Sequence, residues 1–294
     1  MRSDPADFVW LNPGSLEQAL EILANDSNWL SIAGGTDLMV QYAAGTLARR
    51  KLVNIWNLPE LRKINSSSKE LEIGAGATYT DLRLDPIIAR EFPLLDLAAS
   101  WTGSIANQNR GTLGGNIVNA SPAADSLPAL LVYDAELILV SWRGERRLAY
   151  RDFHTGYKQM NLRADELIRA VCLPRKFSGY ISYTRKVGPR AAQAISKVSM
   201  AALARVVRTD RETRIDDARI ACGSVAPVPI RLSQTEQAVL GKSLDAAHIE
   251  LAARTAANEI TPITDIRSTA PYRAAVVRNL VADFMGRLIR GGAE

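Results

Sequence analysis

Two glycine pairs constrain the backbone of this chain more than any other feature of its sequence. The first pair, at 34–35, is followed by Thr36, and the second, at 114–115, has Thr112 two positions before it. Glycine lets the backbone adopt positive φ and lets a ligand approach closely, and consecutive N–H groups in such a turn form a concave anion site. One such loop could be an ordinary tight turn. Two loops, each beside a threonine, predict a ligand that carries two linked phosphates.

The composition is that of an ordinary globular protein. Hydrophobic residues make up 47% and charged residues 23% of the 294 positions, and Lys+Arg 36 against Asp+Glu 31 gives a net charge of +5. The basic residues are dispersed, whereas a nucleic-acid surface concentrates them on one face, so we expect no nucleic-acid partner. A site for an anionic cofactor or an acidic partner would also explain the excess.

The few cysteines and histidines argue against a metal centre in this chain. Cys172 and Cys222 lie fifty positions apart in apolar surroundings, and neither belongs to a CxxC pair. The chain therefore cannot supply the four thiolates of an iron–sulfur cluster, and we expect both cysteines to be buried as small hydrophobes. We expect a structural role for His154 in a loop and a surface position for His248 on a helix.

No segment approaches the eighteen continuous apolar residues of a membrane span, and no apolar run follows the first residues. We therefore expect neither a signal peptide nor a transmembrane helix. The predicted location is cytoplasmic, unless a partner carries the protein elsewhere.

The first part of the chain reads as a small βαβ-like unit. Ser15 and Gln18 form a capping-box pattern for a helix that ends near residues 25–26. Strands are predicted at 29–32 and 52–55. The unit lacks the G-x-G-x-x-G spacing of nicotinamide-binding folds, which disfavours a Rossmann domain.

A second unit begins with a glycine-interrupted strand at 71–78, after which Thr80 or Asp81 can cap a helix. The elements expected next are a helix at 93–101, another helix opening at 121–125, a hairpin of 136–142 with 146–150, and a strand over 165–173 that Pro174 ends. Beyond Pro174 the pattern changes to an antiparallel meander followed by two helices. The predicted strands are 180–186, 195–208 and 214–225, and the predicted helices are 246–259 and 272–289.

The two glycine loops lie within longer motifs that resemble a known family. The motifs are Ala33-Gly34-Gly35-Thr36-Asp37-Leu38, Asn109-Arg110-Gly111-Thr112-Leu113-Gly114-Gly115-Asn116-Ile117, the run from Ala120 to Pro128, and the segment from Thr264 to Arg273. With them the chain resembles, nearly end to end, the FAD-binding medium subunit of molybdenum hydroxylases of the xanthine dehydrogenase, carbon monoxide dehydrogenase and hydroxybenzoyl-CoA reductase type. The run from Asn109 to Pro128 is the most specific of these matches.

The resemblance implies an α+β fold with two α/β FAD-binding subdomains of the vanillyl-alcohol-oxidase-like kind. The expected domains are 1–175 for FAD binding, divided into about 1–57 and 58–175, and 176–294 for a C-terminal domain of antiparallel sheet and helices. The chain lacks the cysteine-rich insertion of some members. The cofactor expected on this chain is therefore noncovalent FAD alone.

The resemblance also implies which residues contact FAD. Residues 32–37 and 112–116 would wrap its diphosphate and ribityl parts, with glycine N–H groups facing the phosphates, and Asp125 would contact a sugar or ribityl hydroxyl. Ile168 would pack beside the isoalloxazine, Lys186 would lie near the flavin, and Trp101 could stack on a ring of FAD. The full implied set is Ile32, Ala33, Gly34, Gly35, Thr36, Asp37, Trp101, Thr112, Gly114, Gly115, Asn116, Asp125, Ile168 and Lys186.

Three of these residues also have purely structural interpretations. Asp125 could be a first-turn helix carboxylate that the helix dipole favours. Lys186 could be an exposed strand lysine, and Trp101 could pack in a core.

By resemblance, the chain is expected to be an electron-transfer subunit and not a self-sufficient enzyme. A large subunit would carry the molybdenum cofactor and a small subunit the [2Fe-2S] clusters, in a heterotrimer or a dimer of heterotrimers. No catalytic residue is predicted in this chain. The alternatives are a stand-alone FAD oxidase or reductase of the vanillyl-alcohol-oxidase-like class and a nucleotide-binding module without redox chemistry.

Overall fold

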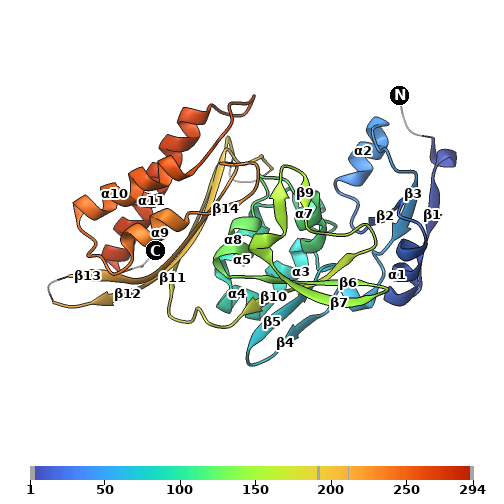
Figure 1. The fold of residues 1–294 in the computed structure, drawn as a ribbon, viewed down its shortest axis with the longest axis horizontal. Helices are drawn as coiled ribbons and strands as arrows, with labels where there is room; N and C mark the ends of the chain where they lie inside the picture. Colours follow the sequence, from blue (N-terminus) through green and yellow to red (C-terminus); the bar gives the residue numbers. More distant parts are fainter. Residues whose placement is uncertain (1–3, 191–192, 211, 292–294) are drawn as a thin grey trace. The chain divides into compact units, whose positions relative to one another are not determined.

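A computed structural model describes residues 4–190, 193–210 and 212–291 (Figure 1). The chain divides into two compact units, each assembled from three separate segments. Unit 1 consists of Met1–Leu84, Ser104–Ala120 and Ala135–Arg175. Unit 2 consists of Asp85–Gly103, Ser121–Asp134 and Lys176–Glu294. The structure does not test the predicted domain boundary at 175, which stays a prediction.

Unit 1 begins with the predicted βαβ arrangement. The strands β1 (Val9–Leu11), β3 (Lys51–Asn54) and β2 (Trp29–Ile32) form a parallel sheet in that order, with α1 (Leu16–Asn25) between β1 and β2 in the chain. The hydroxyl of Ser15 caps α1 by accepting a hydrogen bond from the N–H of Gln18. The side chain of Gln18 accepts in turn from the N–H of Gly14, so the predicted helix start is confirmed.

The second sheet of unit 1 is antiparallel and has five strands. Their order is β4 (Ile64–Ser66), β5 (Glu70–Gly74), β10 (Leu167–Pro174), β6 (Glu136–Ser141) and β7 (Gly144–Ala149). Ser141 pairs with Gly144, so the predicted hairpin turns at Trp142 and Arg143, one residue earlier than expected. Ala19, Leu20 and Leu23 of α1 share a buried cluster with Ile138 and Cys172, which packs the helix against this sheet.

Short helices complete unit 1. They are α2 (Leu38–Ala44), α3 (Tyr79–Leu84), α6 (Ile105–Gln108) and α7 (Leu113–Asn119), accompanied by the small hairpin of β8 (His154–Gly156) and β9 (Gln159–Met160). The prediction that Thr80 or Asp81 caps α3 is wrong, because both lie inside the helix. The cap is Thr78, whose hydroxyl accepts from the N–H of Asp81 while the Asp81 carboxylate accepts from the N–H of Thr78.

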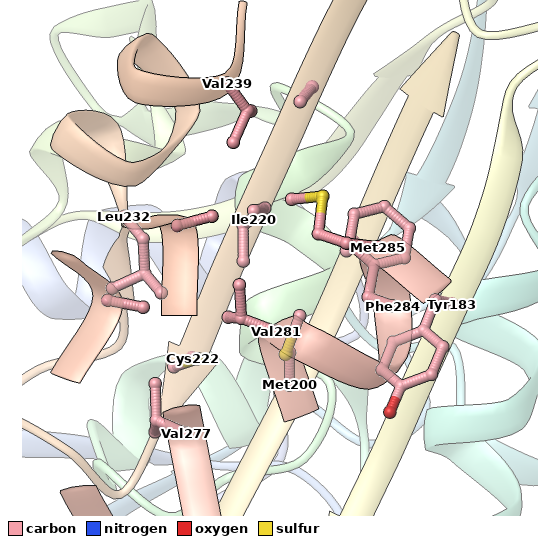
Figure 2. Close-up of a cluster of buried hydrophobic side chains, with 14 of the residues drawn as sticks. Tyr183, Met200, Ile220, Cys222, Leu232, Val239, Val277, Val281, Phe284 and Met285 are labelled. Carbon is pink, nitrogen blue, oxygen red and sulfur yellow. The ribbon is translucent and has the colours of Figure 1, made fainter. Parts of the chain in front are cut away.

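Unit 2 contains the predicted antiparallel sheet and its helices. The strand order is β11 (Ile181–Val187), β12 (Val198–Arg208), β13 (Thr213–Gly223) and β14 (Ile230–Arg231), followed in the chain by α9 (Ser233–Val239), α10 (Ala246–Glu259) and α11 (Ala270–Arg290). Figure 2 shows Val281, Phe284 and Met285 of α11 packed with Met200 and Ile220 of the sheet. The meander and both long helices are confirmed, whereas α9 and β14 were not predicted.

The helices α4 (Pro86–Glu91), α5 (Pro93–Trp101) and α8 (Leu127–Val132) also belong to unit 2. Alternate residues of a strand point to opposite faces, so Met200 faces the C-terminal helices and Ser199 the opposite side, where α5 adjoins β11 and α8 adjoins β12 and β13. The expectation that a helix opens at 121–125 is wrong. Residues 121–124 form a turn, and α8 begins at Leu127 with Ser126 as its N-cap.

The two cysteines are buried, as predicted, and burial raises the pKa of Cys172 and of Cys222 to about 12. Both thiols therefore stay protonated and act as small apolar side chains. Among the described residues, no helix has the length and apolar character needed to cross a membrane. The predicted α+β class is confirmed.

Candidate functional site

The first glycine loop connects β2 to α2 in unit 1. Gly35 has φ +74°, a left-handed conformation that favours glycine, and its carbonyl accepts from the N–H of Met39 at 2.9 Å. The four successive N–H groups of residues 34–37 donate to no group among the described residues. The side chains of Thr36 and Asp37 are exposed. The loop therefore has unused backbone donors in a partly exposed segment, as an anion site requires.

Gly34 allows this loop to pack directly on the segment that precedes the second glycine pair. A Cβ added to Gly34 would lie 1.6 Å from the carbonyl oxygen of Arg110. A Cβ added to Gly111 would lie 3.6 Å from the hydroxyl oxygen of Thr36. Glycine at 34 is thus required by a close approach of protein backbone, and the two predicted loop segments do lie side by side in unit 1.

The second glycine pair differs from the prediction. The N–H of Gly114 donates to the carbonyl of Ala75 at 2.8 Å, and the N–H of Gly115 donates to the hydroxyl of Thr112 at 3.0 Å. A Cβ on Gly114 would lie 2.6 Å from the Cβ of Ala75. The expectation that these glycine N–H groups face a phosphate is therefore wrong, because they pack and cap the first turn of α7. Whether the exposed surface at Gly115 and the half-buried Asn116 contact a ligand stays a prediction.

The other end of α7 is held by the β8–β9 hairpin. His154 Nε2 lies 2.9 Å from the carbonyl oxygen of Ile117, and Lys158 Nζ donates to the side-chain oxygen of Asn119 at 2.7 Å. Burial lowers the pKa of His154, although the hydrogen bond to Ile117 opposes that shift. A neutral ring that donates from Nε2 to Ile117 can accept at Nδ1 from the hydroxyl of Tyr150, 3.3 Å away. The structural role predicted for His154 is consistent with these contacts.

In unit 2 the structure brings three of the predicted residues together. Lys186 Nζ lies 2.5 Å from Asp125 Oδ2 and 3.1 Å from the carbonyl oxygen of Trp101. The other carboxylate oxygen of Asp125 accepts from the hydroxyl of Ser196 at 2.5 Å. The side chains of Lys186 and Asp125 are only 3% and 8% exposed. This cluster of Trp101, Asp125, Lys186 and Ser196 is called the buried ion-pair cluster below.

Two structural interpretations from the sequence are wrong at this cluster. Lys186 is buried and is therefore not an exposed strand lysine. Asp125 precedes the N-cap of α8 and is therefore not a first-turn helix carboxylate. Burial raises the pKa of the Asp125 carboxyl, while the ammonium of Lys186 and the hydroxyl of Ser196 act in the opposite direction. No local sequence pattern indicates Ser196 as a member of this cluster, because its partner Asp125 lies far away along the chain.

Two of the predicted residues, Ile168 and Trp101, are expected to lie against rings of FAD. Ile168 is buried in β10 opposite Leu139, next to an irregularity where the register shifts before Ala170. Trp101 is the last residue of α5 and is half-buried, so its ring is accessible in part. The proposed stacking of either residue against a flavin stays a prediction.

Comparisons with known proteins identify the family of this chain and the cofactor of that family. Residues 6–176 match the family model described as the FAD binding domain in molybdopterin dehydrogenase, and residues 183–288 match the CO dehydrogenase flavoprotein C-terminal domain. The chain belongs to the family of molybdopterin dehydrogenase FAD-binding subunits. The family predicted from the sequence motifs is confirmed.

Individual relatives of this FAD-binding subunit match along nearly their whole length. The chain is 31% identical over 268 residues to the xanthine dehydrogenase FAD-binding subunit of Escherichia coli O157:H7, covering 90% of each chain. It is 30% identical over 276 residues to the glyceraldehyde dehydrogenase medium chain of Sulfolobus acidocaldarius, covering 94% of this chain and 96% of the other. A chain of carbon monoxide dehydrogenase from Hydrogenophaga pseudoflava has a TM-score of 0.90 at 26% identity, covering 96% of both chains.

The first glycine loop of this FAD-binding subunit fits the cofactor on its own geometry. FAD carries a diphosphate, and anionic oxygens bind well to a run of backbone N–H groups with no other partner. Residues 34–37 offer four such groups. The glycine N–H groups at 114 and 115 do not fit this role, since protein acceptors occupy them.

Proposed function

We propose that this FAD-binding subunit of the molybdenum hydroxylase family transfers electrons from the iron–sulfur clusters of a partner subunit to an external acceptor. The proposal rests on the match of residues 6–176 to the FAD binding domain in molybdopterin dehydrogenase. Two of the relatives above are described as a FAD-binding subunit and a medium chain, which supports a role as one subunit of a larger assembly.

The protein's contribution is to bind and orient the cofactor. We propose that the N–H groups of residues 34–37 and the hydroxyl of Thr36 bind the diphosphate of FAD, with residues 32–33 and the exposed surface of 112–116 completing the loop contacts. Asp125, Ile168, Lys186 and Trp101 are proposed as the residues that contact the rest of the cofactor. Bound FAD supplies redox chemistry that accepts and releases electrons singly or in pairs.

The buried ion-pair cluster determines how strongly the positive charge of Lys186 can act on a bound cofactor. Its ammonium is held by Asp125 and by the carbonyl of Trp101. Because the carboxylate balances the ammonium, the pair is close to neutral as a unit. The ammonium group of Lys186 therefore acts as a hydrogen-bond donor with a fixed position. It does not act as an isolated positive charge.

The proposed partners are a large subunit with the molybdenum cofactor and a small subunit with [2Fe-2S] clusters, assembled as a heterotrimer or a dimer of heterotrimers. We expect a stable complex to bury an interface of roughly 1,000 Å² or more. The positive net charge of +5 favours acidic partner surfaces, so assembly should weaken at high salt.

The test is to express the chain alone and together with the products of its neighbouring genes, and to follow flavin bleaching with aldehydes, purines and carbon monoxide. Rapid bleaching that requires the molybdenum and iron–sulfur chains supports the proposal. Efficient oxidation of an organic substrate by the isolated chain would refute it and would identify a stand-alone flavoenzyme.

A further inference from the structure

Arg110 is held in a fixed position beside the first glycine loop. Its guanidinium carbon lies 4.0 Å from the ring centroid of Trp56, a short cation–π distance, and its Nε lies 3.4 Å from the carbonyl oxygen of Gly34. Its own carbonyl oxygen is the atom against which Gly34 packs. Backbone and side chain of Arg110 therefore both adjoin the loop whose N–H groups at 34–37 have no partner among the described residues.

A second arginine on the same indole provides an internal comparison. The guanidinium carbon of Arg62 lies 4.7 Å from the ring centroid of Trp56, and its Nη2 is paired with Asp81 at 3.1 Å. Arg110, by contrast, has no carboxylate within ion-pair distance in the part of the chain that the structure describes. The positive charge of Arg62 is thus balanced within the protein, and that of Arg110 is not.

We propose that Arg110 is a further cofactor-binding residue whose guanidinium binds the diphosphate of FAD together with the N–H groups of residues 34–37. The inference rests on the proposed binding of FAD by the first glycine loop. A guanidinium presents planar N–H donors that match phosphate oxygens, and such charge-assisted bonds are stronger than neutral ones. Arg110 is exposed, so an anionic ligand can reach it without disrupting a core.

Trp56 preorganises the side chain of Arg110 for ligand binding. Trp56 is half-buried. Its backbone N–H donates to the side-chain oxygen of Asn54 at 3.0 Å, which fixes the backbone of this residue just after β3. Stacking on the indole restricts the rotamers of the long arginine side chain. Less conformational entropy is then lost when the guanidinium binds phosphate.

The experiment uses the full chain freed of flavin and measures the Kd of FAD by the quenching of flavin fluorescence at several KCl concentrations. Arg110→Met removes the charge and keeps the aliphatic stem. We expect it to raise Kd by roughly ten- to a hundredfold at low salt and to make Kd less dependent on salt. Arg110→Lys keeps the charge and loses the planar donors, so its Kd should be intermediate with the salt dependence of the wild type.

Arg62→Met is the matched control, because it removes one positive charge from the other arginine stacked on Trp56. Its Kd should stay within a few fold of the wild-type value, with an unchanged salt dependence. If Arg110→Met binds FAD as the wild type does, or binds it more weakly with an unaltered salt dependence, the inference is wrong.

Failure of the proposed function looks different from failure of this inference. A wild-type chain that binds no FAD would refute the proposed function itself. Unfolding by urea, measured on each variant without FAD, shows whether a weaker Kd comes from a damaged fold. If Arg110→Met does not fold, the Arg110→Lys variant decides: a wild-type Kd for Lys at this position would then contradict the role of the planar guanidinium.

Discussion

Lys186 and Asp125 form an ion pair of 2.5 Å between side chains that are 3% and 8% exposed. Burial of two charges costs desolvation energy, which their attraction and extra hydrogen bonds must offset. Ser196 and the carbonyl of Trp101 provide those extra bonds. Removal of one partner is therefore far more damaging than removal of both.

We expect Lys186→Met to lower the free energy of unfolding by about 3–5 kcal/mol, because it leaves the Asp125 carboxylate buried and unpaired. The double variant Lys186→Met/Asp125→Asn should regain most of that loss. Urea unfolding of the four proteins of this cycle measures the coupling. Additive effects of the two substitutions would show that the pair makes no net contribution.

The stability of the protein should depend on pH through His154. Because burial lowers the pKa of His154 in the folded state, the unfolded chain binds a proton at this residue first. The contribution of neutral His154 to the free energy of unfolding is fully present above pH 6.5, near the pKa of histidine in the unfolded chain. It is lost as the pH falls from there through the lower folded-state pKa.

His154→Gln should therefore lose less stability than the wild type as the pH falls below 6.5, as measured by urea unfolding. His248→Gln is the control, since His248 is the only other histidine and lies on α10 beside Asp245. Equal pH dependence in the wild type and His154→Gln would contradict the prediction.

The two glycine loops should respond very differently to alanine. A Cβ at Gly34 meets the backbone oxygen of Arg110 at 1.6 Å, so Gly34→Ala must separate the two segments and should cost about 3 kcal/mol or more. A Cβ at the exposed Gly115 meets only the hydroxyl of Thr112, at 2.8 Å. That side chain can rotate, and alanine favours the helix, so Gly115→Ala should change stability by about 1 kcal/mol or less.

Thermal unfolding in the absence of FAD ranks these two variants, and FAD titration then shows whether each loop is also needed for binding. Gly34→Ala should lose FAD along with its loop geometry. Equal stability of the two variants would mean that the close approach at Gly34 is relieved without cost.

FAD should be bound without a covalent link. Neither histidine nor cysteine lies in a glycine loop: His154 is hydrogen-bonded to Ile117, and both cysteine thiols are buried with raised pKa values. Precipitation with acid should therefore release all of the yellow colour into the supernatant. Flavin that remains on the washed pellet would contradict this expectation.

Local signals in the sequence predicted the elements that local interactions determine. Ser15 and Gln18 start α1 as expected, and α10 has the predicted bounds, because caps and helical periodicity act within a few residues. The glycine pair at 34–35 likewise forms a loop with unused N–H groups.

Two errors at the candidate site lie where a distant segment decides the outcome. The N–H of Gly114 donates to the carbonyl of Ala75, and the ammonium of Lys186 is buried in an ion pair with Asp125. Both partners lie far away in the sequence. The same is true of Arg110, whose stacking on Trp56 depends on how two separate segments pack. A glycine motif shows that the backbone can approach something closely, but not whether that neighbour is a ligand or the protein itself.

The division of unit 2 into three segments has a consequence for any attempt to exchange parts between relatives. The chain leaves and re-enters this unit around residues 85–103 and 121–134, which carry α5 and α8. A piece cut near residue 175 would keep the sheet of β11–β14 but lose both helices, exposing the face that carries Lys186 and Ser199. A fragment that begins at that junction should therefore be insoluble, and a chimera joined there would pack the sheet of one parent against the helices of the other. Functional chimeras of these subunits should require all three segments to come from one parent.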